Sequence, residues 1–337
     1  EVPSPSVLVQ WDMALRFAAR SAGWCKKMTQ PTARLSTAAA AVHEPDLDVL
    51  TSVEGGVGLL TLNRPKKLHT LTLDMVQAIT PALQAWEMDP GVQCVLIRSS
   101  PWGGKAFCAG GDVRAVFDEG LGGDPAHGQG QAGMLTAEFF RQEYHMNYLI
   151  HEFPKPIVSL WDGIVMGGGV GLTAHGDFRV ATEKTVFAMP ETAIGLFPDV
   201  GMTHVLPRLF SPSNTAPSSI GFYVGLTGVR LGCDDLLFAG LATHAIPSEH
   251  LEALHAAILH TDVASVSDLE ILLTDFQQTG SIGDKAASKL AANIDAIERC
   301  FSKDSIEDIV EALEAESQAP EWAQKTLKLL HSQRAPE

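Results

Sequence analysis

Two carboxylates stand eight residues apart in a stretch that is otherwise apolar or rich in glycine and proline, AMPETAIGLFPDVG at 188–201. They are Glu191 and Asp199. Because apolar surroundings disfavour a charged carboxylate, we expect raised pKa values and acid–base chemistry at both side chains. The residues alone fit a second interpretation equally well, in which Glu191 is a first-turn helix acid after Pro190 and Asp199 belongs to a turn.

A further carboxylate, Glu143, lies in a predicted helix with the sequence MLTAEFFRQEYHMNYLI. It follows Phe139 by four residues and precedes Met146 by three and Ile150 by seven, which places it on the apolar stripe of that helix. An unpaired carboxylate is costly to bury there. Glu143 therefore has a partner on that stripe or faces a site.

Two glycine-rich segments each lead from an apolar strand into a helix-like stretch: GGKAFCAGGDVRAVFDEG at 103–120 and MGGGVGLTAHGD at 166–177. One backbone N–H from each turn could converge on a single oxygen, with the helix dipoles adding to the attraction for negative charge. Such a pair is an oxyanion hole. A tight turn that merely requires glycine remains the simpler explanation of either segment alone, and neither contains a phosphate-loop pattern.

The elements that must position these residues alternate between strand and helix. Apolar runs at 57–63, 94–100, 157–165 and 178–189 predict strands, and 71–90 predicts a helix through Val76, Ile79, Leu83 and Trp86. This rhythm is typical of an α/β protein with a parallel or mixed sheet. Beyond 248 the pattern is wholly helical. We expect a core over 43–247 and a C-terminal helical region over 248–337.

The N-terminal segment differs in composition from the rest. Residues 13–42 contain five Lys or Arg, many alanines and no acid, while residues 1–12 precede the first methionine. This composition predicts an organellar transit peptide, preceded by an upstream extension. A basic, disordered tail is the other interpretation. In either case we exclude residues 1–42 from the fold.

Composition and charge exclude several classes of function. The formal net charge is −16, whereas nucleic-acid-binding proteins typically carry an excess of basic residues. No apolar run approaches the ~20 residues of a membrane-spanning helix. The five cysteines are scattered and form no C-x-x-C pair, which predicts reduced thiols and no zinc site.

Together these segments resemble the crotonase (enoyl-CoA hydratase/isomerase) superfamily, and within it the 3-hydroxyisobutyryl-CoA hydrolase branch. The resemblance runs from about Asp46 to the end of the chain, through LNRPKKL (62–68), KAFCAGGDVR (105–114), the long block 166–201, LPRL (206–209), LTGVRL (226–231) and AGLATHAIPSEHL (239–251). It implies a crotonase-like ββα spiral core with a C-terminal helical region. Because the hydrolases normally continue with further helices, it also implies that this region is truncated.

The resemblance assigns roles to individual residues. Gly111 and Gly168 would donate the oxyanion hydrogen bonds, Glu191 and Asp199 would be catalytic, and Glu143, Glu191, Asp199 and Gly168 would contact the substrate. CoA would lie near 64–68 and 105–109. In that region Lys66, Leu68 and Ala109 would bind it, and Arg64, Lys66, Lys67 and Lys105 would approach its phosphates.

One position separates the activities within the superfamily. Its hydratases carry a glutamate just after the glycine triplet, where this chain has Gly171. The resemblance therefore favours a mitochondrial-matrix thioesterase of valine catabolism, with CoA as part of its substrate and no metal or cofactor. It would involve no nucleic acid and no membrane, and a homo-oligomer is compatible with the sequence. Hydratase or isomerase activity and a non-catalytic organellar scaffold remain alternatives.

Overall fold

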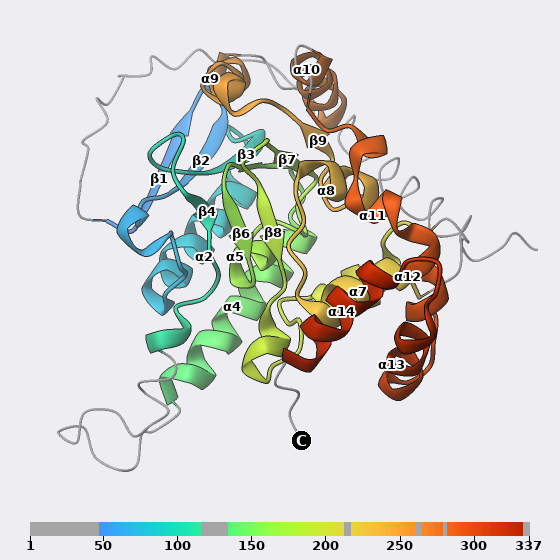
Figure 1. Cartoon of the computed structure of the whole chain (residues 1–337). Helices are drawn as coiled ribbons and strands as arrows, with labels where there is room; N and C mark the ends of the chain where they lie inside the picture. Colours follow the sequence, from blue (N-terminus) through green and yellow to red (C-terminus); the bar gives the residue numbers. More distant parts are fainter. Residues whose placement is uncertain (1–46, 116–133, 212–216, 261–264, 279–281, 333–337) are drawn as a thin grey trace, which may run out of the picture. The chain divides into compact units, whose positions relative to one another are not determined.

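The computed structural model describes residues 47–115, 134–211, 217–260, 265–278 and 282–332 (Figure 1). The predicted transit peptide and upstream extension at 1–42 lie outside the described residues. From Asp48 onward the chain forms one compact unit, which carries all the candidate site residues.

The larger sheet has six strands in the order β1-β2-β3-β5-β7-β9. The first two form an antiparallel hairpin, and every other neighbouring pair is parallel. The sheet is therefore mixed, as the sequence predicts. Its strands are β1 (Val49–Glu54), β2 (Val57–Leu62), β3 (Cys94–Ser99), β5 (Ile157–Trp161), β7 (Phe178–Ala181) and β9 (His244–Ala245).

A smaller parallel sheet contains β4 (Ala106–Cys108), β6 (Ile164–Met166) and β8 (Val186–Ala188). Its existence corrects the sequence prediction, because the apolar runs 157–165 and 178–189 each form two strands in different sheets. In the first run the chain breaks at Gly163, whose φ is +95° and which packs so closely that a Cβ would lie 2.6 Å from the Lys105 carbonyl oxygen. The hydrophobic run continues through the break, so periodicity alone could not reveal it.

Helix α2 (Leu73–Met88) begins at Thr72, whose hydroxyl accepts a hydrogen bond from the Met75 N–H at 3.2 Å. Its predicted apolar face is buried, and the helix continues through Pro81. Helix α4 (Met134–Glu152) packs against α2 and carries Glu143. Two helices are very short: α5 (Gly168–Gly171) begins within the glycine triplet, and α6 (Met202–Val205) follows the Asp199 turn.

The C-terminal part is helical: α12 and α14 pack against α7, and α13 packs against α12 and α14 (Figure 1). Tyr223 of α7, Phe301 and Trp322 form a cluster of tilted and edge-to-face aromatic rings there. The helices are α7 (Ser219–Thr227), α8 (Cys233–Ala239), α9 (Leu251–His260), α10 (Val266–Gln278), α11 (Lys289–Ala292), α12 (Ile294–Phe301), α13 (Ile306–Ala315) and α14 (Pro320–Ser332).

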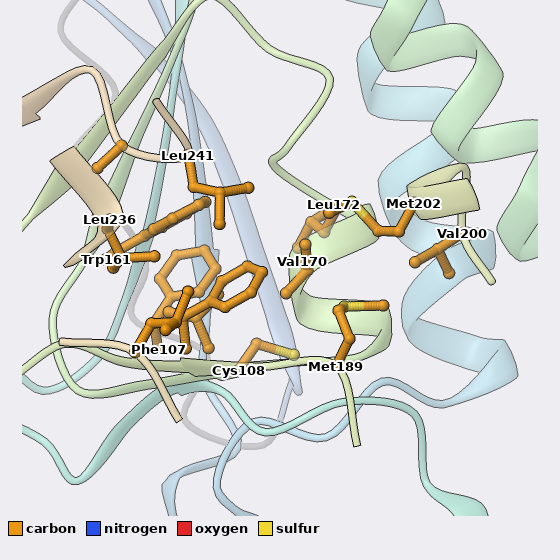
Figure 2. Packing of buried hydrophobic residues seen from close by; sticks show 14 of the residues in the cluster. Phe107, Cys108, Trp161, Val170, Leu172, Met189, Val200, Met202, Leu236 and Leu241 are labelled. Carbon is orange, nitrogen blue, oxygen red and sulfur yellow. The ribbon is translucent and has the colours of Figure 1, made fainter. Parts of the chain in front are cut away.

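Within the described ranges, none of these helices combines the length and the apolar character that a membrane crossing requires. The hydrophobic core extends from the sheets into the C-terminal helices and includes Ile297, Phe301 and Leu313. Figure 2 shows part of this core, where Val170 and Leu172 of the glycine-triplet segment lie beside Val200 and Met202.

Candidate active site

The first glycine turn follows β4. Leu71 forms a parallel bridge with Gly111, in which the Leu71 N–H donates to the Gly110 carbonyl and the Asp112 N–H donates to the Leu71 carbonyl, each at 2.8 Å. In such a bridge the intervening residue directs its own N–H away from the partner strand. The Gly111 N–H therefore points away from Leu71 and is available to a ligand.

The second glycine turn leads from β6 into α5. Gly167 adopts a φ of +47°, and Gly168 is the first residue of the helix, so its N–H has no acceptor within α5. A Cβ on Gly168 would lie 3.2 Å from the Gly111 nitrogen and closer still to Glu143 Oε1. The two predicted oxyanion donors thus lie together, beside the Glu143 carboxyl.

The glycine triplet is required by close packing as well as by backbone conformation. A Cβ on Gly167 would approach Glu191 Oε1 to 2.8 Å, and one on Gly169 would approach Cys108 Cβ to 2.7 Å. Both separations are too short for real carbon contacts. Glycine at these positions lets α5 lie directly on the end of β4 and lets the Glu191 carboxyl reach the turn.

The three carboxylates come from three separate elements. Glu143 belongs to α4, Glu191 opens the 3₁₀ helix η3 (Glu191–Ile194), and Asp199 precedes α6 in a turn closed by the Met202 N–H donating to the Asp199 carbonyl at 2.8 Å. Their exposed fractions are only 2% for Glu143 and 7% each for Glu191 and Asp199. The first-turn and turn positions of Glu191 and Asp199 are therefore confirmed, and both side chains are nevertheless buried.

Burial and mutual repulsion suppress ionisation of this cluster. Burial, followed by the charges of Asp199 and Glu191, raises the pKa of Glu143 to about 8. Burial, reinforced by Asp199, also raises the pKa of Glu191 to about 8. Among the described residues, Glu143 Oε1 and Glu191 Oε2 are buried and have no hydrogen-bond partner. Each of these carboxyl groups can therefore donate a proton to a bound molecule when protonated, or accept one from it when ionised.

Asp199 differs from the other two because it has a partner. The Tyr144 hydroxyl donates to Asp199 Oδ2 at 2.7 Å. Burial raises the pKa of Asp199, and the Tyr144 hydrogen bond acts in the opposite direction by stabilising the anion. Tyr144 is not among the residues predicted from the sequence, and its only sequence signal is its position next to Glu143.

The side chain of Val200 occupies the space beside Gly171. A Cβ on Gly171 would lie 2.9 Å from both γ-carbons of Val200 and closer still to its Cβ. Val200 itself has a φ of +47°, which is unusual for a β-branched residue and costs on the order of 1–3 kcal/mol. In this conformation of the turn, position 171 cannot carry a glutamate.

The predicted CoA-binding residues lie at the outer side of the first glycine turn. The Ala109 N–H donates to the Leu68 carbonyl at 3.0 Å, so 62–68 and 105–114 are directly joined, and Lys66, Lys67 and Lys105 are exposed. Arg64 is used differently. Its guanidinium lies 3.0 Å from Asp112 and 3.4 Å from Asp48, so it links the loop to the turn rather than presenting a free cation.

No group of three or more His, Cys, Asp or Glu side chains suited to a metal ion occurs in the described part of the chain. The site consists of two backbone N–H donors, three carboxyls and a tyrosine hydroxyl. It can stabilise an oxyanion and transfer protons, the combination used in acyl transfer.

Comparison with known proteins identifies the family of the chain. The enoyl-CoA hydratase/isomerase family pattern matches residues 57–336, and the chain belongs to this family. Proteins named 3-hydroxyisobutyryl-CoA hydrolase, mitochondrial, are similar along most of the chain. The Danio rerio protein is 43% identical over 81% of this chain and 66% of its own length. The Gallus gallus protein is 45% identical over 79% and 64%, so the match spans just under two thirds of these relatives.

Solved structures share the fold. A carnitinyl-CoA dehydratase from Mycobacterium thermoresistibile has a TM-score of 0.71 and 37% identity over 85% of this chain and 75% of its own. An enoyl-CoA hydratase from Rhodobacter sphaeroides has a TM-score of 0.68 and 39% identity over the same shares. The predicted crotonase-like fold is therefore confirmed.

Proposed function

We propose that this chain is an acyl-CoA thioester hydrolase that acts on 3-hydroxyisobutyryl-CoA. The observation that carries the proposal is the convergence of the Gly111 and Gly168 amides with the carboxyls of Glu143 and Glu191. The names of the curated relatives support the substrate, and the geometry supports acyl transfer.

In the proposed reaction the N–H groups of Gly111 and Gly168 polarise the thioester carbonyl and stabilise the oxyanion. Ionised Glu191 either removes a proton from the attacking water or attacks the carbonyl carbon itself, giving a mixed anhydride that water then hydrolyses. In both routes the C–S bond breaks, CoA leaves as a thiolate that takes up a proton, and the free acid is released. Asp199 and Glu143 bind the 3-hydroxyl group.

The CoA portion is assigned to the outer side of the first turn. Leu68 and Ala109 are proposed to contact it, and Lys66, Lys67 and Lys105 offer exposed cations for the phosphates despite the acidic chain. No metal or redox cofactor is assigned, because every proposed step uses protein groups and water. We also propose location in the mitochondrial matrix, directed by residues 1–42; relatives of this chain are named mitochondrial.

Hydration is the alternative that a specific observation favours, since the similar solved structures are named hydratase and dehydratase. By the resemblance, hydratase activity would use a glutamate at position 171, and the Val200 side chain leaves no room for it. A non-catalytic scaffold would have no use for three buried carboxyls beside the amides of Gly111 and Gly168.

Product analysis tests the proposal. The chain from Asp46 onward is incubated with 3-hydroxyisobutyryl-CoA, and the products are identified by mass spectrometry. Hydrolysis gives free CoA and 3-hydroxyisobutyrate, whereas the hydratase class gives methacrylyl-CoA by loss of water. Free CoA without the dehydrated thioester is expected. Methacrylyl-CoA as the main product, or unchanged substrate, would overturn the proposal.

A further inference from the structure

His175 lies four residues beyond the end of α5 and contacts the turn that carries Asp199. Its Nε2 is 2.8 Å from the carbonyl oxygen of Val200. Since a carbonyl oxygen can only accept, Nε2 carries the proton in this contact. Burial lowers the pKa of His175, which favours the neutral ring. A neutral imidazole carries one N–H proton, on either Nδ1 or Nε2.

The turn at 199–201 has an unfavourable backbone conformation that needs support. Val200 and Gly201 have φ values of +47° and +82°. The His175 ring also packs on the second of these residues, because a Cβ on Gly201 would lie 2.6 Å from His175 Cε1 and 2.7 Å from Nε2. The imidazole thus supports the turn by a hydrogen bond and by direct packing.

The same turn touches α5 itself through the close approach of Val200 to Gly171. Figure 2 shows Val200 beside Val170 and Leu172. Gly168, the proposed oxyanion donor, starts this helix, and Asp199 directly precedes Val200. The contacts of His175 and Val200 therefore connect the oxyanion donor to the carboxylate across the site.

We propose that His175 is a positioning residue, which fixes Asp199 relative to the oxyanion helix by donating a hydrogen bond to the Val200 carbonyl. Its kinetic consequence rests on the proposed hydrolase function, whereas its structural consequence does not. Without the bond, the strained turn relaxes and the Asp199 carboxyl moves away from the substrate hydroxyl.

A matched pair of variants isolates the hydrogen bond. Gln and Met have similar length and volume, but only Gln can donate from the position of Nε2. His175→Met is expected to lower kcat about 100-fold, in line with the loss from a misplacement of about 1 Å, while KM changes by less than about threefold. His175→Gln should stay within about fivefold of wild type. His151→Met is the control, because the His151 ring lies edge-on to His175 with centroids 6.1 Å apart and is not part of the turn.

Two further measurements do not depend on hydrolysis. Crystal structures of both variants should show the Asp199 carboxyl displaced from Gly168 with Met and retained with Gln. The ¹⁵N spectrum of the wild-type histidines should show the Nε2-protonated neutral tautomer for His175, and it decides the proposal if the Met variant does not fold. An unmoved Asp199 in the Met variant, a Gln variant as impaired as the Met variant, or the Nδ1-protonated tautomer would each overturn it. An inactive wild type would instead refute the proposed function and leave these two readouts valid.

Discussion

The Tyr144 hydroxyl donates to Asp199 Oδ2 across 2.7 Å, while the preceding residue, Glu143, reaches the oxyanion turn. Adjacent residues of a helix diverge by about 100°, so α4 can serve both sides of the site with two consecutive side chains. Tyr144 retains 39% exposure, so this residue lies between the buried carboxyl cluster and solvent.

Replacing Tyr144 by phenylalanine should lower kcat/KM by about 10- to 100-fold, because a hydrogen bond to a charged group contributes on the order of 1.5–3 kcal/mol. Without the donor, Asp199 should also ionise at higher pH. Steady-state kinetics of thiol release measure the first effect. Tyr148→Phe is the matched control, since Tyr148 lies on the same helix with 62% exposure and should leave kcat/KM unchanged. Equal losses in both variants would show that the Asp199 contact has no special role.

The pH dependence of kcat/KM should follow ionisation of the carboxyl cluster. If Glu191 acts as a carboxylate, and burial raises its pKa to about 8, activity must increase with pH and level off above that value. Below it the slope should approach tenfold per pH unit. The apparent pKa belongs to the coupled cluster rather than to one residue. A profile that is flat between about pH 5 and 8 would contradict an ionised Glu191 as the reacting group.

Glu143→Gln should stabilise the protein at alkaline pH. The folded-state pKa of Glu143 is raised to about 8, so the stability linked to its bound proton is complete below the unfolded-state pKa and is lost as pH rises through about 8. A glutamine side chain does not titrate and stays neutral at both pH values. Because each pKa unit corresponds to about 1.4 kcal/mol and the cluster shares the effect, we expect a gain on the order of 1–3 kcal/mol at pH 8 and almost none at pH 4.5.

Urea unfolding at the two pH values measures this difference. Glu138→Gln on the same helix provides the control, because the Glu138 side chain is 40% exposed and the hydrogen bonds from Arg141 and Gln142 lower its pKa. Its replacement should not increase stability at alkaline pH. A Glu143→Gln variant with the same relative stability at both pH values would mean that Glu143 is ionised in the folded protein.

Gly171→Ala should destabilise the chain through the clash with Val200, by about 1–3 kcal/mol as for other overpacked cores. In the double variant Gly171→Ala/Val200→Gly, the loss should be smaller than the sum of the two single effects, because the new methyl then occupies the vacated space and a glycine in the turn tolerates a positive φ. Unfolding free energies of all four proteins form the cycle. Strict additivity would show that the two positions do not compete for space.

The positions of several site residues could be predicted from their local sequence surroundings. Glu143 on an apolar stripe and Glu191 and Asp199 in an apolar segment are buried, as the patterns indicate, and the two glycine turns lie beside them. These signals are local, and burial follows from the neighbours in sequence.

The remaining features depend on contacts between distant segments. The Tyr144 hydrogen bond spans 55 residues, and the Gly171–Val200 contact depends on how α5 meets a turn with positive φ values. The same limitation applies to Arg64, which we expected at phosphates and which pairs with Asp112, and to the break at Gly163. Periodicity carries no information on such tertiary contacts.

The central claim is that Glu191, beside the Gly111 and Gly168 amides, drives thioester hydrolysis. Thiol release from 3-hydroxyisobutyryl-CoA by wild type and by Glu191→Gln at pH 8 tests it most directly, since the substitution keeps the shape of the side chain and removes its proton chemistry. We predict steady release by the wild type and a loss of at least about 100-fold in the variant. A variant that releases CoA within about tenfold of the wild-type rate would contradict the account.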